Sequence, residues 1–198
     1  MKNRIIRTAR HLFFRRGFRE VTMDEIAHQL GISKKTLYQH FPAKEVLIEA
    51  SIEHLRQEIE QYLEKLCQAG KDPVEEFVAI REIARQVLKD IEATPSYQLE
   101  RYYPEIADRM KQAHMELVVR WMTRNIQRGQ QLGLYRSELD PEIAARFFFI
   151  GMSGIGNPLL FPSNQYERWK IHEQFLRFFL DVLLTSKGRS HLSKIQSA

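Results

Sequence analysis

Apolar side chains recur at three- and four-residue intervals along most of this 198-residue chain. This spacing is typical of amphipathic helices, and no segment alternates polar and apolar positions for long enough to predict a strand. The pattern therefore predicts an all-α fold of about nine helices. After residue 44, the expected helices cover about 45–69, 73–92, 97–102, 105–132, 141–152 and 166–184. Residues 187–198 are polar, and we expect them to form a mobile tail.

Residues 22–44 (TMDEIAHQLGISKKTLYQHFPAK) carry the most informative local pattern. Thr22 and Glu25 form a capping box, so one short helix should begin directly after Thr22. Gly31 suits a left-handed helix end, and Ser33 is a good N-cap for a second helix. Two short helices over a shared apolar knot form a helix–turn–helix. An ordinary helical hairpin with a basic solvated face remains the alternative on spacing alone.

The distribution of charge favours the helix–turn–helix. Residues 1–50 hold ten Lys and Arg against five acidic residues, whereas residues 51–198 hold twenty of each sign. The whole formal charge of +5 therefore lies beside the predicted turn. A basic patch of this kind is typical of a polyanion-binding surface, and we expect double-stranded DNA to be the partner. Its affinity should fall steeply with salt.

The order of these motifs resembles a known family. Gly17-Phe18, Gly31-Ile32-Ser33, the string TLYQHF at 36–41 and Lys44 together look like the DNA-binding domain of the TetR/AcrR family of bacterial transcriptional regulators. The resemblance covers about the first fifty residues, and GLYRSELDPE at 133–142 resembles a weaker signature late in many members. It implies a two-fold dimer joined by a four-helix bundle of the last two helices. It also implies a variable domain that binds a small-molecule effector, and repression as the usual outcome.

These observations divide the chain into three parts: a helix–turn–helix domain over 1–45, a ligand-sensing and dimerisation domain over 46–186, and the tail. The candidate DNA-binding residues lie on or beside the second short helix: Thr22, Ser33, Lys34, Lys35, Thr36, Tyr38, Gln39, His40 and Lys44. The first helical turn, which holds Lys34, Lys35 and Thr36, is best placed to reach base edges. Tyr38, His40 and Lys44 suit phosphates. For Lys35 and Gln39, simple solvation is an equal alternative.

The last two predicted helices are apolar on several faces at once. A helix on a monomer surface needs one apolar stripe, so apolarity all round indicates burial from two sides. We therefore expect a homodimer, although a helix sunk in a large core would show the same pattern. The predicted interface comprises Phe147, Phe148, Ile150, Phe175, Phe178, Phe179, Val182 and Leu183. Two recognition helices related by a two-fold axis would require a palindromic operator.

The effector site is predicted only as the resemblance implies it. Candidate lining residues are Arg101, Tyr102, Tyr103, Met110, His114, Trp121 and Asn125. For each of them, an ordinary place in the core is the alternative interpretation. The identity of the effector is left open.

Other classes of protein find little support in the sequence. It has no H-E-x-x-H pair, G-x-S-x-G elbow or phosphate-binding glycine loop, so we expect no catalytic residues, no metal and no cofactor. The lone Cys67 excludes an internal disulfide. No apolar run is long enough for a signal peptide or a membrane span, so we expect a cytoplasmic protein without a membrane partner. An architectural DNA-binding protein without an effector remains the rival function.

Overall fold

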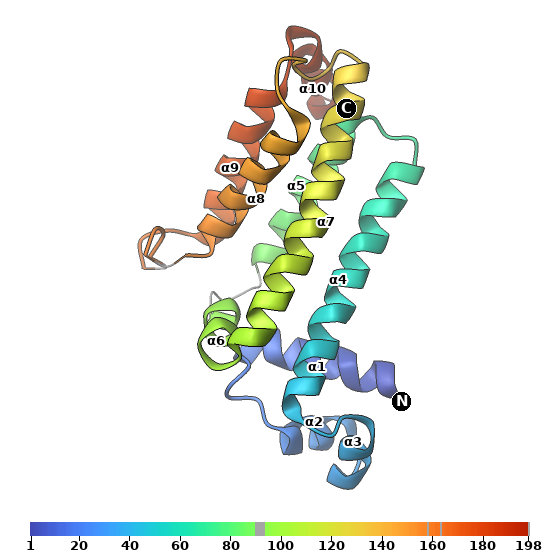
Figure 1. Cartoon of the computed structure of the whole chain (residues 1–198), viewed down its shortest axis with the longest axis vertical. Helices are drawn as coiled ribbons and strands as arrows, with labels where there is room; N and C mark the ends of the chain where they lie inside the picture. The colour runs from blue at the N-terminus through green and yellow to red at the C-terminus, as the bar shows by residue number, and fades with distance from the viewer. Residues whose placement is uncertain (90–93, 158, 163, 198) are drawn as a thin grey trace. The chain divides into compact units, whose positions relative to one another are not determined.

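The computed structural model describes residues 1–89, 94–157, 159–162 and 164–197, and every named secondary-structure element within these ranges is a helix, as predicted. Ten helices are present in the described residues (Figure 1): α1 Lys2–Arg16, α2 Met23–Leu30, α3 Lys34–His40, α4 Lys44–Gln68, α5 Pro73–Lys89, α6 Thr94–Tyr102, α7 Pro104–Gln131, α8 Pro141–Ile155, α9 Arg168–Leu183 and α10 Ser186–Ser197. The predicted helix over 73–92 is observed as far as Lys89, and its last three residues lie outside the described part of the chain.

The expectation of a polar tail after the last helix needs correcting, because residues 186–197 form α10. The Thr185 hydroxyl accepts a hydrogen bond from the Gly188 amide (3.1 Å), which caps the start of this helix. Leu192 and Ile195, three positions apart, pack against a hydrophobic cluster. Two apolar residues in a polar segment give too little periodicity for a sequence-based prediction of a helix.

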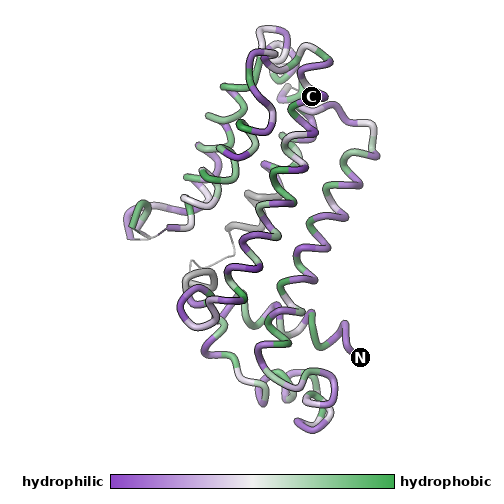
Figure 2. The backbone as a smooth tube through the Cα atoms, in the orientation of Figure 1, coloured by the Kyte–Doolittle hydropathy of each residue, from purple (hydrophilic) through white to green (hydrophobic). Residues whose placement is uncertain are grey.

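The helices group into two compact units. One unit contains residues 1–61 and the described part of 91–114, and the other contains the described parts of 62–90 and 115–198. Helices α4 and α7 each contribute residues to both units. The first unit is therefore larger than the expected domain 1–45, since it includes α6 and the start of α7. Along α4 and α7, apolar and polar positions alternate in the manner of amphipathic helices (Figure 2).

The first unit is built around side chains of α1, α2 and α3. Phe13 and Phe18 stack with their ring centroids 5.5 Å apart, and Ile26 and Leu37 are fully buried beside them. Leu99 of α6 belongs to the same cluster. A segment distant in sequence thus completes the core beneath the helix–turn–helix.

The second unit is built around aromatic rings of α5, α8 and α9. The rings of Phe77 and Phe179 are stacked at 6.4 Å, and Phe148 meets Phe179 edge-on at 4.9 Å. Gly151 allows α8 to approach α9 closely, because a Cβ atom there would lie 2.2 Å from the Phe175 ring. The second unit therefore depends on a ring cluster that includes several residues predicted to face a partner.

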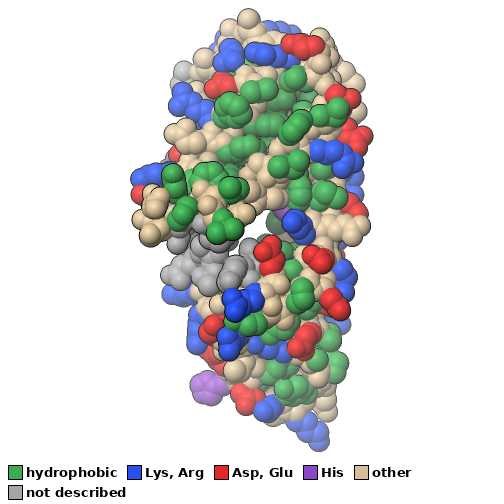
Figure 3. Space-filling view, turned by 60° about the vertical axis from the view of Figure 1, so that its left-hand side comes forward, with side chains coloured by type: hydrophobic (Ala, Val, Ile, Leu, Met, Phe, Trp, Pro, Cys, Tyr) green, Lys and Arg blue, Asp and Glu red, His purple; other side chains and the backbone are tan. Residues whose placement is uncertain are grey.

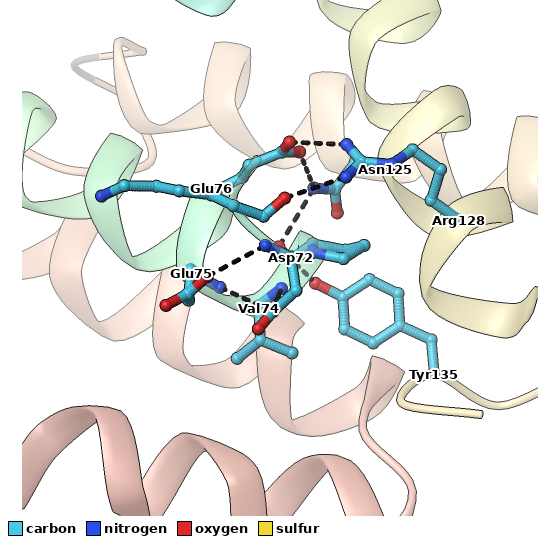
Figure 4. A network of polar contacts seen from close by, with 9 residues as sticks. Asp72, Val74, Glu75, Glu76, Asn125, Arg128 and Tyr135 are labelled. Carbon is cyan, nitrogen blue, oxygen red and sulfur yellow. Dashed lines mark hydrogen bonds and ion pairs between the residues drawn. The ribbon is translucent and has the colours of Figure 1, made fainter. Parts of the chain in front are cut away.

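A buried polar network fixes the start of α5 within this unit (Figure 4). The Glu76 side chain is fully buried, and its carboxylate accepts hydrogen bonds from Asn125 (2.9 Å) and Arg128 (2.5 Å). The Tyr135 hydroxyl donates to the carbonyl of Pro73 at 2.9 Å. Burial raises the pKa of Tyr135, so the phenol stays protonated and remains a donor. A buried carboxylate is tolerated here because it has one partner of opposite charge, Arg128, and a second hydrogen-bond donor, Asn125.

We expect Gly129→Ala to lower the free energy of unfolding by about 1–3 kcal/mol, because its Cβ atom would meet the Tyr135 ring at 2.1 Å. Gly154→Ala is the matched control. It also lies inside a helix, but its Cβ atom would have only an ordinary contact at 3.8 Å, so the change should be neutral or stabilise by up to about 1 kcal/mol. Urea unfolding measures both variants, and equal stabilities would contradict the packing described for Gly129.

His172 should make stability depend on pH. Its side chain is buried on α9, its Nδ1 atom has no hydrogen-bond partner, and burial together with the nearby Arg168 lowers its pKa from 6.5 to about 4. Below pH 6.5 the imidazole of His172 binds a proton in the unfolded chain but stays neutral in the folded chain. Its contribution to the free energy of unfolding is therefore full above pH 6.5 and is lost as the pH falls towards 4. The expected loss is about 1.4 kcal/mol per pH unit.

His172→Leu should remove this part of the pH dependence, which is measured by urea unfolding at several pH values. The difference between wild type and variant isolates the imidazole from the carboxyl groups that also titrate in acid. Stability curves that stay parallel from pH 7 to about pH 4 would contradict this assignment.

Candidate nucleic-acid interface

The turn between α2 and α3 is held by the capping interactions that the sequence predicts. The Thr22 hydroxyl accepts a hydrogen bond from the Glu25 amide (3.2 Å), and the Ser33 hydroxyl accepts one from the Thr36 amide (3.0 Å). Gly31 is left-handed, with φ 65° and ψ 33°. This conformation costs glycine little, and it sets the direction in which α3 leaves the turn.

Helix α3 buries one side and presents the other to solvent. Leu37 is fully buried, and Phe41 at the helix end is 1% exposed. Lys34, Lys35, Tyr38, Gln39 and His40 are all exposed, whereas Thr36 is half-buried with its hydroxyl 2.8 Å from the hydroxyl of Ser33. The structure therefore brings most of the predicted DNA-binding side chains onto one solvent-facing surface.

The two adjacent lysines of α3 differ in their surroundings. The Lys34 ammonium lies 2.7 and 3.0 Å from the two carboxylate oxygens of Asp24 on α2, and this bond raises the pKa of Lys34. Lys35 makes no ion pair with any residue that the structure describes. The role of Asp24 could not be predicted from the sequence, because a partner on another helix leaves no periodic signal.

Lys44, at the start of α4, is less accessible than predicted. Its ammonium donates to the main-chain carbonyl of Arg19 at 3.1 Å, and burial lowers its pKa. An ammonium has three donor hydrogens, so contact with a phosphate remains open to it. Lys44 therefore also helps to hold the segment that connects α1 and α2.

Other basic side chains of the first unit are held by acidic or aromatic partners. Arg16 pairs with Glu25. The Arg19 guanidinium donates to the hydroxyl of Tyr102 at 2.7 Å and lies 4.8 Å from the centre of its ring. The basic surface predicted from the charge count therefore contains two kinds of side chain. Some cations are paired, and others, such as Lys35, have no ion pair within the described residues.

The predicted effector residues are divided between the two compact units. Met110 and Asn125 both lie on α7, fifteen residues and therefore about 22 Å apart along the helix. Tyr103 and Met110 pack against the core of the first unit, while Trp121 belongs to the core of the second. Arg101 and His114 are exposed, and Tyr102 contacts Arg19.

Asn125 also has a structural role, since it donates to Pro73 and Glu76. An open groove of about 520 Å³ lies between α7 and α8, and its lining includes Val119, Thr123 and Arg146. None of the predicted effector residues lines this groove. Tyr103, Met110 and Trp121 have the ordinary place in the core that was the alternative interpretation.

The predicted interface residues separate into two groups. Phe148, Phe179 and Leu183 are buried in the subunit's own core, so these three need correcting as interface residues. Phe175 is only half-buried, and its place in the interface stays a prediction. Phe147, Ile150, Phe178 and Val182 are 64%, 62%, 67% and 39% exposed. Both groups are apolar, so periodicity alone could not tell the core side from the outer side.

The thiol of Cys67 and the potential metal ligands are the groups to inspect for reactive chemistry. Cys67 is half-buried, and burial raises the pKa of its thiol, which disfavours the nucleophilic thiolate. No group of three or more potential metal ligands is found in the part of the chain that the structure describes. Within the same residues, no helix is long and apolar enough to cross a membrane.

Comparison with known proteins agrees with the geometry of the first three helices. Residues 5–51 match the bacterial regulatory proteins of the tetR family. The uncharacterized HTH-type transcriptional regulator YerO of Bacillus subtilis is 45% identical over 53 residues, which are 27% of this chain and 18% of that protein. IcaR of Staphylococcus aureus, a negative transcriptional regulator of the biofilm operon icaADBC, is 40% identical over 52 residues, 26% of this chain and 28% of IcaR.

The matching segment thus spans between about a fifth and under a third of the length of these relatives. Similarity of fold extends further. A tetR-family transcriptional regulator from Agrobacterium tumefaciens superposes with a TM-score of 0.75 at 20% identity, over 93% of this chain and 97% of that one. SmeT, the repressor of a multidrug efflux pump in Stenotrophomonas maltophilia, gives 0.67 at 19% identity, over 94% and 91%.

Proposed function

We propose that the chain is a sequence-specific DNA-binding regulator of transcription, as the match of residues 5–51 to the bacterial regulatory proteins of the tetR family supports. The observation that carries the proposal is the exposed face of α3, which α2 and the turn at Gly31 hold over a shared core. A regulator of bacterial transcription acts where the DNA lies, so we infer a cytoplasmic location.

The geometry suggests how this surface meets DNA. A recognition helix lies in the major groove with its first turn towards the base edges. In α3 that turn carries Lys34, Lys35 and Thr36. Tyr38 and His40, further along the exposed face, can donate to phosphates on either side of the groove. The charge of residues 1–50 adds long-range attraction that depends on salt.

We further propose that the protein acts as a homodimer through α8 and α9. Ile143, Phe147 and Ile150 follow one another at helical spacing along α8 and are more than half exposed. Phe178 and Val182 are four residues apart on α9 and are 67% and 39% exposed. Hydrophobic side chains gather on the face formed by these helices (Figure 3). Contiguous exposed apolar surface of this kind is typical of subunit interfaces. A two-fold dimer would place two copies of α3 in successive major grooves, about 34–36 Å apart on a palindromic site.

Repression is the outcome that the relatives support. IcaR is a negative regulator and SmeT is a repressor. We propose that this chain represses its target genes and that an effector, a small molecule of unknown identity, relieves the repression. The second unit offers its groove between α7 and α8 as a place to look for such a molecule.

Genome-wide footprinting of the purified chain tests the proposed function. A regulator should protect one or a few palindromic sites. Uniform protection without sequence preference would contradict it and would support an architectural DNA-binding protein.

Replacing single lysines should separate base contacts from phosphate contacts. Lys34→Ala should relax sequence preference by about 1–3 kcal/mol, whereas Lys35→Ala should reduce the slope of log affinity against log salt by about one. Lys44→Ala should weaken binding to all sequences alike. Fluorescence anisotropy over a salt series measures these quantities, and variants with unchanged affinity and slope would refute the assignment.

Replacing an outward apolar residue should separate the subunits. The wild type should sediment at micromolar concentration with twice the mass of the 23.5 kDa chain, and Phe178→Ser should shift it towards the monomer. Lys194→Ser, an exposed position on α10, serves as the control and should remain dimeric. A wild type with monomeric mass would rule out the dimer.

A further inference from the structure

An ion pair joins Asp24 to Lys34, a residue of the proposed DNA-reading surface. Asp24 is in the first turn of α2 and Lys34 is the first residue of α3, so the pair spans the helix–turn–helix. The two side chains are 63% and 59% exposed. Exposed ion pairs contribute little to stability. The shared core, rather than this pair, holds the two helices together.

The pair changes what the Lys34 ammonium can bind. An ammonium has three donor hydrogens, so Lys34 can keep its bond to Asp24 and still donate to a neutral acceptor such as O6 or N7 of guanine. A phosphate in the same place would carry a negative charge beside the Asp24 carboxylate and would be repelled. The pair thus favours a base edge over a backbone phosphate as the partner of Lys34.

We propose that Asp24 is a specificity-determining residue, which positions Lys34 for base readout and suppresses its binding to phosphates. This inference rests on the proposed function, and it names a residue that controls discrimination between specific and non-specific DNA sequences. Non-specific binding comes almost entirely from phosphate contacts, so neutralising one lysine lowers it selectively. Specificity obtained by penalising the wrong partner is a general device in recognition.

Lys35 provides the contrast within the same helix. It is exposed, and it forms no ion pair among the residues that the structure describes. Lys35 is therefore available to any phosphate, whereas Lys34 is held at 2.7 Å from a carboxylate oxygen. The two neighbouring lysines would therefore have different roles. Lys35 would contribute to the affinity for DNA of any sequence, and Lys34 would contribute to sequence specificity.

A double-mutant cycle of Asp24→Asn and Lys34→Gln tests the proposal. Affinity is measured by anisotropy for a duplex of mixed sequence and for a site selected from random DNA, each over a salt series. Asp24→Asn should raise affinity for the mixed duplex by up to about tenfold near 0.1 M salt and steepen the salt slope by about 0.9, as one added phosphate contact would. The ratio of specific to non-specific affinity should fall.

In the Lys34→Gln background, Asp24→Asn should change neither the affinity for the mixed duplex nor the salt slope, because Asp24 acts through Lys34. An equal change in both backgrounds would mean that Asp24 merely repels DNA, and no change in either would mean that it has no role; each result overturns the proposal. A purely structural role would move the unfolding midpoint without steepening the salt slope. Absence of sequence preference in the wild type would instead refute the proposed regulator.

Discussion

A helix of seven residues is not stable by itself in water, and α3 exists because Leu37 and the adjoining Phe41 are buried in the core of the first unit. That burial determines which side of α3 faces solvent. Because Leu37 points into the core, the rotation of α3 about its axis is fixed. This rotation places Lys34 beside Asp24 and leaves Lys35 in solvent. The core beneath the turn is thus the condition on which the reading surface depends.

Local features of the fold were predictable because their causes are local. Thr22, Gly31 and Ser33 act on backbone groups within four residues, and each has the conformation or bond that its type favours. The all-helical class was predictable for the same reason, since apolar spacing is a property of the segment itself.

Features that depend on contact between distant segments could not be read in this way. The partners of Lys34 and Arg19 lie 10 and 83 positions away, and no spacing rule connects them. The helices α8 and α9 show the limit clearly: Phe147 and Phe148 are adjacent and identical in type, yet one is exposed and the other buried. Only the packing of α8 on α9 and α5 decides between them.

The contacts of α6 and α7 show how far along the chain the core of the helix–turn–helix extends. Gln98 accepts a hydrogen bond from the Arg19 amide (3.1 Å), and Leu99 and Ile106 complete the same hydrophobic cluster as α1 to α3. The family match ends at residue 51, and Gln98, Leu99 and Ile106 all lie after it in the sequence. A fragment cut at that point would expose the apolar surface that they cover. The helix–turn–helix is therefore not an independent module, because its core includes residues that follow the family match in the sequence.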